Sequence, residues 1–135
     1  ELRAFATASR FAALFDEIKG IAEDQAQEEK KSATDFNVSK DQLEGWIGAR
    51  AKEMRTYVYL ALKDWYRDLL VVASGATDQT LFYEEYRDTL TKLGTKLTTD
   101  TVISCINQID ELIVYLDERH IRPDIALNYW FGRLR

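Results

Sequence analysis

An apolar stripe of helical period runs through residues 47–72 and meets no proline or glycine after Gly48. Before the stripe, Ser39 and Gln42 have the spacing of a capping box, and after it Gly75 suits the position beyond a helix end. The stripe therefore predicts one long helix from about residue 39 to residue 74. Its members recur every three or four residues, as one face of an α-helix requires: Ile47, Ala51, Met54, Val58, Leu62, Trp65, Leu69 and Val72.

Helices are predicted along most of the chain, because its 135 residues contain only one proline and six glycines. They cover residues 2–19, 81–94 and 99–119, and a last helix begins at Pro123, a residue that suits the first helical position. The segment 23–35 lacks large apolar side chains and is predicted to be either a solvated end of the first helix or a linker. The expected apolar faces hold Phe11, Leu14, Phe15, Ile18 and Ile21, then Leu81, Phe82, Tyr86, Leu90 and Leu93, and then Val102, Ile103, Ile106, Ile109, Leu112, Ile113 and Leu116.

These elements predict an all-α fold, an antiparallel bundle of five or six helices with short connections. The length suits a single domain over residues 1–135, large enough to bury one core.

The charge and cysteine content limit the classes of partner. A formal net charge of -5 argues against a surface dominated by nucleic-acid binding. The last seventeen residues hold Arg119, Arg122, Arg133 and Arg135 against Asp124, so a local basic patch for DNA stays open beside ordinary helix-end charge. The single cysteine predicts no internal disulfide and a cytoplasmic location. No membrane partner is expected, since the longest apolar run, residues 69–73, is far too short to span a bilayer.

Signatures of catalysis and of cofactor binding are missing from the sequence. It contains no phosphate-binding loop, no dinucleotide fingerprint and no common zinc motif, so neither an enzyme nor a cofactor is expected. Cys105 lies among isoleucines and is interpreted as a small buried hydrophobe. The spacing of Asp117 and His120 puts both on one helical face, where they could bind a metal ion with Asp124. Pro123 should end the helix before Asp124, however, which favours a hinge between two helices.

Three adjacent aromatic residues stand near the C-terminus, at positions 129–131. At ~100° per residue they cannot all face one core, so part of this cluster should meet a neighbouring helix or a partner. A helical bundle that binds a ligand or metal through this cluster and His120 is the alternative function.

Two motifs resemble the C-terminal domain of the delta-prime subunits of the bacterial DNA polymerase III clamp loader. The first is "LKDWYRDLLVVASG", residues 62–75, which is similar to the family's Trp-x-Arg-Asp-Leu-Leu helix with its following glycine. The second is "RPDIALNYWFGRLR", residues 122–135, which is similar to the family's closing turn and helix. The related gamma/tau-type subunits share this bundle. The chain departs from the family at His120 and Arg122, where asparagines are common, and at Asn128, where an acidic residue is usual.

The resemblance implies a helical collar domain that assembles subunits and catalyses nothing. In the family an ATPase-like module precedes the collar, and we expect it upstream of this chain. Five collars hold the ring that loads the sliding clamp during DNA replication by the polymerase holoenzyme. The implied partners are the gamma/tau and delta subunits, with DNA and clamp contacted only through the full assembly.

The stretch "KDWYRDLL", residues 63–70, places Arg67 and Asp68 among apolar residues. Helix geometry puts Arg67 opposite the Trp65 face and Asp68 at its edge. We therefore expect Asp68 to be an internal polar tie, to a neighbouring helix, and Arg67 to face outward without needing Asp68 as its partner. The expected subunit-interface residues are Tyr66, Arg67, Trp130 and Arg133, and the expected structural residues are Trp65, Asp68, Leu69, Pro123 and Leu127.

Overall fold

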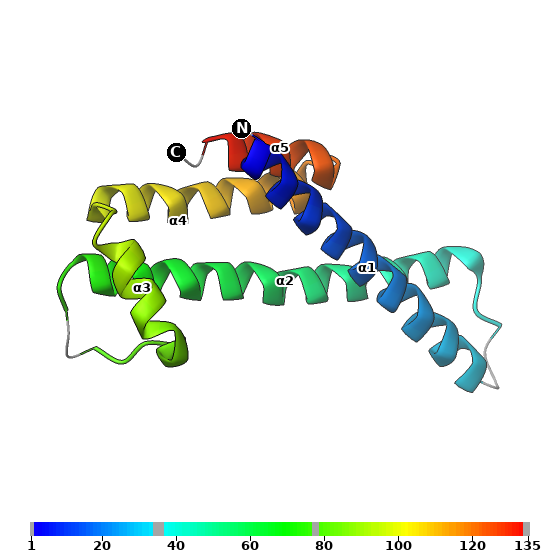
Figure 1. Ribbon diagram of the computed structural model, residues 1–135. Coiled ribbons are helices and arrows are strands. Elements are labelled where there is room, and N and C mark those ends of the chain that lie inside the picture. The colour runs from blue at the N-terminus through cyan, green and yellow to red at the C-terminus, as the bar shows by residue number, and fades with distance from the viewer. Residues whose placement is uncertain (1, 34–36, 77–78, 134–135) are drawn as a thin grey trace. The chain divides into compact units, whose positions relative to one another are not determined.

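The computed structural model describes residues 2–33, 37–76 and 79–133, with the side chains of residues 2–5 left aside. This part of the chain is all-α, as predicted, and its five α-helices are shown in Figure 1. They are α1 (Leu2–Ser32), α2 (Lys40–Ala73), α3 (Arg87–Gly94), α4 (Thr99–Ile113) and α5 (Pro123–Arg133). A 3-10 turn η1 (Glu84–Tyr86) precedes α3, and a π-helical turn η2 (Val114–Glu118) extends α4. Within the described ranges, no helix combines the length and apolar character that crossing a membrane requires.

The ends of α2 follow the local signals in the sequence. Ser39 and Gln42 form the predicted capping box, in which the Gln42 amide donates to Ser39 Oγ (3.2 Å) and the Ser39 amide donates to Gln42 Oε1 (2.9 Å). At the other end, Gly75 has a φ of 76° and its amide donates to Val72 O, while the Ala76 amide donates to Val71 O. This pair of bonds is a Schellman cap, which a glycine in the left-handed region makes possible.

Two other helix starts are also confirmed. Thr98 caps α4, because its hydroxyl accepts from the Thr101 amide (3.2 Å). Pro123 is the first residue of α5, where its missing amide costs no helical hydrogen bond. The first helix continues through Gly20 to Ser32, so the solvated helix is the correct alternative for the described part of residues 23–35.

The chain divides into two compact units, which are described separately. The first unit comprises Glu1–Tyr57 and Ile121–Arg133, and the second comprises Val58–His120. The boundary falls within α2, which contributes residues to both. Whether the chain behaves as one domain stays a prediction.

In the first unit, α1 packs against α5 and against the start of α2. The beginning of α1 and α5 lie side by side (Figure 1). Between them the Phe11 and Phe131 rings lie 5.4 Å apart, measured between centroids. Ala26 packs with Val38 and Leu43 at the α1–α2 end. The buried face of α1 differs from the predicted one, since Leu14 and Ile21 are exposed. Phe15 and Ile18 are buried as predicted, and small residues take the remaining places, because a helix packed at close range buries alanine readily: Ala8, Ala22 and Ala26.

In the second unit, the end of α2 packs antiparallel to α4 and is covered by the segment that leads into α3. The antiparallel order follows from two pairs, Tyr59 with Asp117 (3.4 Å) and Lys63 with Asp110. The buried core joins four residues from three helices and the connecting segment: Leu69, Leu81, Leu90 and Val102. The predicted membership of Phe82, Tyr86, Leu93 and Ile103 is wrong, because all four side chains are exposed.

Gly94, the last residue of α3, provides a test of this packing. A Cβ at this position would lie 2.8 Å from Val72 Cγ1 and 3.3 Å from Val72 Cβ, both on α2. We expect Gly94→Ala to lower the free energy of unfolding by about 1–3 kcal/mol, because overpacking outweighs the helix propensity of alanine.

Gly20→Ala is the matched control, since a Cβ there meets nothing within 4 Å. It should raise the free energy of unfolding by about 1 kcal/mol, measured by urea denaturation. Equal effects of the two substitutions would contradict the close approach of α3 and α2.

Candidate functional site

The side chain of Asp68 holds the segment Thr80–Tyr83 against α2. Asp68 is fully buried, with 0% exposure. Its Oδ2 accepts from the Tyr83 amide at 2.8 Å, and its Oδ1 accepts from the Phe82 amide at 3.2 Å. A buried carboxylate requires such donors, and hydrogen bonds to an ionised acceptor are stronger than neutral ones. We expected a neighbouring helix as its partner, but the partner is the turn that precedes η1.

Arg67 is part of the same tie and pairs with Asp68, a pairing that the sequence left open. Its Nη1 donates both to Asp68 Oδ1 (2.9 Å) and to the Thr80 carbonyl (2.8 Å). The guanidinium also lies over the Phe82 ring, 5.0 Å from the centroid. Arg67 and Asp68 are consecutive residues of α2 and start in different directions from the helix axis. The segment Thr80–Tyr83 binds both side chains, so their charged groups meet beneath it.

Aromatic contacts complete the attachment of this turn. The Trp65 ring lies 5.7 Å from the Tyr83 ring and 5.9 Å from the Tyr86 ring. The Tyr83 hydroxyl donates to the carbonyl of Ala61, one helical turn before Trp65 (3.3 Å). Beneath them, Leu69 is buried in the core of the second unit. Trp65, Arg67, Asp68 and Leu69 thus act together to fix one turn.

The remaining expected interface residues lie in different surroundings. Tyr66 is half-buried on α2 and packs against the core of the second unit. Trp130 is only 4% exposed, whereas its neighbour Tyr129 is 52% exposed. Arg133 is exposed, lies over the Tyr129 ring and donates to its hydroxyl (3.2 Å). Tyr66 and Arg67 belong to the second unit and Trp130 and Arg133 to the first, and the contact of these residues with another subunit stays a prediction.

Two of the expected structural residues belong to α5. Pro123 starts the helix and Leu127 is 1% exposed. The aromatic cluster 129–131 is divided by the helix: Trp130 and Phe131 pack edge to face at 4.6 Å, and Tyr129 points outward. The sequence analysis did not identify Tyr129 as the exposed member of the cluster. Its spacing of four from Ile125 was the available signal, because residues four apart lie on one side of a helix.

His120 belongs to the turn that follows η2. It is exposed and has a φ of 52°, in the left-handed region that histidine enters more readily than most residues. Among the described residues, no group of three or more histidine, cysteine, aspartate or glutamate side chains could hold a metal ion. The ligand-binding alternative through His120 and the aromatic cluster stays a prediction.

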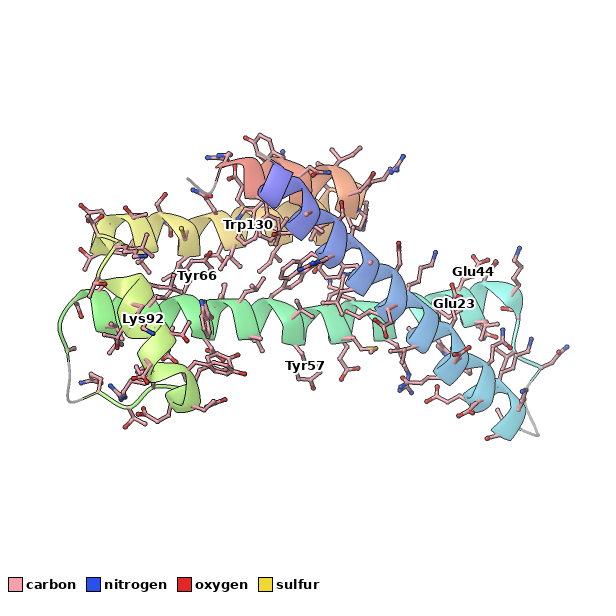
Figure 2. The ribbon with its side chains drawn as sticks, viewed as in Figure 1. Glu23, Glu44, Tyr57, Tyr66, Lys92 and Trp130 are labelled. Atoms are coloured by element: carbon pink, nitrogen blue, oxygen red, sulfur yellow. The ribbon has the colours of Figure 1, made fainter. Side chains whose placement is uncertain are left out.

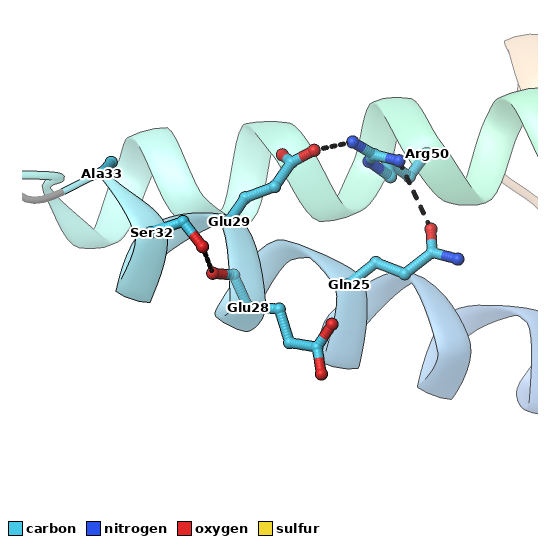
Figure 3. A pocket seen from close by; sticks show the side chains of 6 residues that line it. All are labelled: Gln25, Glu28, Glu29, Ser32, Ala33 and Arg50. Carbon is cyan, nitrogen blue, oxygen red and sulfur yellow. Dashed lines mark hydrogen bonds and ion pairs between the residues drawn. The ribbon is translucent and has the colours of Figure 1, made fainter.

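A polar pocket of about 520 Å³ lies between the end of α1 and α2, in the first unit (Figure 3). Arg50 pairs with Glu29 and donates to Gln25 Oε1 (3.4 Å) across it, and Ser32 Oγ donates to the Glu28 carbonyl (3.1 Å). The charge of Arg50 is therefore neutralised by Glu29 of the same chain. The lining residues are Gln25, Glu28, Glu29, Ser32, Ala33 and Arg50, and none of them was a predicted site residue.

Burial affects two titratable groups between α2 and α4. Burial, with a smaller contribution from Cys105, raises the pKa of Tyr66 to about 12 (Figure 2). Burial also raises the pKa of the Cys105 thiol. A thiol with a raised pKa is a poor nucleophile at neutral pH. Cys105 is half-buried, rather than fully buried as the sequence predicts.

The raised pKa of Tyr66 predicts a loss of stability at alkaline pH. The folded chain holds the phenol proton more tightly than the unfolded chain, whose tyrosine pKa is near 10.0. This contribution is complete below pH 10 and is lost as the pH rises from about 10 to about 12. Over that range we expect the wild type to lose about 1–2 kcal/mol more than Tyr66→Phe, allowing for solvent screening.

Urea denaturation at a series of pH values measures this difference. Tyr57→Phe, at a position 66% exposed, is the control and should follow the wild type. Parallel profiles for the wild type and Tyr66→Phe would contradict the burial of the Tyr66 phenol.

Comparison with models of protein families found no match, and neither did comparison with curated proteins or with solved structures. The resemblance to clamp-loader collars therefore rests on the two sequence motifs.

Proposed function

We propose that this chain is a non-catalytic subunit-assembly domain of a bacterial DNA polymerase III clamp loader, of the delta-prime type. It works in the cytoplasm and joins the gamma/tau and delta subunits through their collar domains. DNA and the sliding clamp are reached through the full assembly.

The observation that supports this proposal is the joint action of the residues in the first motif. Trp65, Arg67, Asp68 and Leu69 are the residues that carry the resemblance, and they hold a single turn in place through a buried carboxylate, a guanidinium and an aromatic ring. A charged pair in an apolar helix is costly unless it serves such a tie. These residue types at this spacing therefore have a structural role, because together they fix the turn against α2. A domain that assembles subunits requires such a fixed shape.

Mixing this chain with the collar domains of gamma/tau-type and delta-type subunits from the same genome tests the proposal. Light scattering coupled to size-exclusion chromatography should show a complex whose mass is the sum of its members. Individual masses alone, at tens of micromolar of each protein, would overturn it.

A single substitution connects the test to the expected interface residues. Arg133→Ala removes an exposed arginine and should weaken the complex without changing the melting temperature of the free chain. Arg10→Ala, also an exposed arginine, is the matched control and should leave the complex intact.

A further inference from the structure

A cluster of aromatic and acidic side chains lies in the second unit, where the turn before α3 meets α2. At its centre, the Trp65 ring lies 5.7 Å from the Tyr83 ring and 5.9 Å from the Tyr86 ring, measured between centroids. The Tyr83 hydroxyl donates to the carbonyl of Ala61, one helical turn before Asp64 (3.3 Å). The group is named the Trp65 surface and has five members: Asp64, Trp65, Tyr83, Glu85 and Tyr86.

Negative charge surrounds the phenol of Tyr83. Burial raises the pKa of Tyr83, and the charges of Asp64, Asp68 and Glu85 raise it further. A negative charge opposes the loss of a phenol proton, so these carboxylates lie close enough to act on the Tyr83 hydroxyl. All the charges that shift this pKa are negative.

Two of these three carboxylates lack a basic partner. Asp68 belongs to the buried tie described above. Among the described residues, no ion pair engages Asp64 or Glu85. Arg87, the base nearest to Glu85 in the sequence, is bound by Glu84, with the Nη2–Oε2 bond at 2.7 Å. The Trp65 surface therefore has an excess of negative charge.

The aromatic part of the surface is accessible, since the Tyr86 side chain is 49% exposed. A neighbouring exposed ring, that of Phe82, already has the Arg67 guanidinium over it at 5.0 Å. In the part of the chain that the structure describes, no arginine or lysine lies over a ring of the Trp65 surface. Aromatic faces attract cations, and free carboxylates beside them add to that attraction.

The arrangement of the rings selects among organic cations. A quaternary ammonium is bound where several rings enclose it. The rings here contact one another directly, at 5.7 and 5.9 Å, so they leave no room for such a group between them. A guanidinium is planar, so it can stack on one ring face and donate from its edge to a carboxylate. Nucleic acids and anionic lipids are disfavoured, because their charge has the same sign as the surface.

We propose that the Trp65 surface binds an arginine side chain in a basic segment of a partner protein. The guanidinium lies over the Tyr86 ring, and the carboxylates of Asp64 and Glu85 supply the acceptors. One exposed contact between a cation and a ring is weak, so the rest of the partner's segment contributes the remaining contacts. This inference is independent of the proposed function, because it defines the partner by its chemistry and not by a place in a clamp loader.

Nuclear magnetic resonance of the tryptophan indole groups tests the contact. Hexaarginine amide is added to the isotope-labelled full chain at low salt, and the three indole N–H signals are followed. The Trp65 signal, identified by its loss in Trp65→Phe, should shift with a Kd of roughly 1 mM or tighter, and should shift less at high salt. The signals of Trp46 and Trp130, in the first unit, should stay in place. A Trp65 signal that does not move at up to about 10 mM peptide would overturn the proposal.

Two further ligands distinguish stacking from charge alone. Hexalysine amide has the same charge without the planar group and should bind about threefold more weakly or worse. Tetramethylammonium should give no saturable shift, since the rings do not enclose it. Equal affinity for the two peptides would reduce the site to a charge effect, and saturable binding of tetramethylammonium would make it a site for quaternary ammonium. Either result contradicts the proposal.

Substitutions within the Trp65 surface identify the groups involved. Asp64→Asn/Glu85→Gln removes both carboxylates at constant side-chain size and should weaken hexaarginine binding by about tenfold. Tyr86→Ala removes the stacking ring and should weaken binding by about threefold, whereas Tyr86→Phe should bind as the wild type does. A Tyr86→Ala chain that is folded by circular dichroism and binds with full affinity would show that the ring is not part of the site.

Glu23→Gln/Glu44→Gln is the matched control, since it removes the same charge from two exposed acids of the first unit (Figure 2). It should bind hexaarginine within about twofold of the wild type. If this control loses as much affinity as Asp64→Asn/Glu85→Gln, binding follows the net charge of the chain and the proposed site is wrong.

Discussion

Replacing Asp68 with alanine is expected to lower the free energy of unfolding by about 3–5 kcal/mol. The substitution leaves the amides of Phe82 and Tyr83 without their acceptor and leaves Arg67 without its carboxylate. Breaking one side of a buried ion pair is costly because the other members stay desolvated without compensation. Urea denaturation followed by circular dichroism gives the size of the loss.

Two further variants separate the tie from a general effect of removing charge. Asp68→Asn keeps one carbonyl acceptor at the same position and should lose less stability than the alanine variant. Glu53→Ala removes an exposed acid from the same helix and should change stability by less than about 0.5 kcal/mol. An Asp68→Ala chain as stable as Glu53→Ala would show that the carboxylate does not hold the turn.

Replacing Trp130 with alanine is expected to cost about 3–5 kcal/mol, the usual range for truncating a buried aromatic residue. Trp130 is 4% exposed, and its ring packs against Phe131 at 4.6 Å. Its role is therefore to stabilise α5 in the first unit. Any loss of subunit association in Trp130→Ala should accompany a lowered melting temperature.

Tyr129→Ala, one residue earlier, is the comparison because that ring is 52% exposed. It should change the free energy of unfolding by no more than about 0.5 kcal/mol. Trp130→Phe should be tolerated better than alanine, since Trp130 Nε1 is buried with no hydrogen-bond partner among the described residues. A stable Trp130→Ala chain that no longer assembles would instead make Trp130 an interface residue.

Most of the helix ends were predictable because the signals are local. Ser39 with Gln42, Gly75, Thr98 and Pro123 each act on backbone groups within five residues of themselves. A cap forms wherever the chain enters or leaves a helix, whatever packs against that helix later. The all-α class followed from these signals and from the helical period between them.

The buried faces were less predictable, because side-chain size is an incomplete guide to contact. Leu14, Ile21 and Ile103 belong to apolar stripes and yet are exposed, whereas Ala22 and Ala26 are fully buried. Which side of a helix is covered depends on how closely its neighbours approach, and close approach selects small residues. Ala22 and Ala26, four residues apart, were the sign of this close approach. An apolar stripe is usually identified from leucine and isoleucine, so the alanines were not counted in it.

The contacts of Arg67 and Asp68 could be predicted only in part from the sequence. The pattern was sufficient to expect a buried carboxylate at position 68, since a charge at the edge of an apolar stripe requires a donor. It did not reveal that the donors are the amides of Phe82 and Tyr83, or that Arg67 joins the same tie. Those contacts depend on where the chain returns after α2, and that path is determined by long-range packing of Leu81 and Leu90 against Leu69. Local hydrogen bonds can be predicted because both partners are close in the sequence. A tertiary contact such as that of Asp68 with Phe82 and Tyr83 depends on how the whole chain folds.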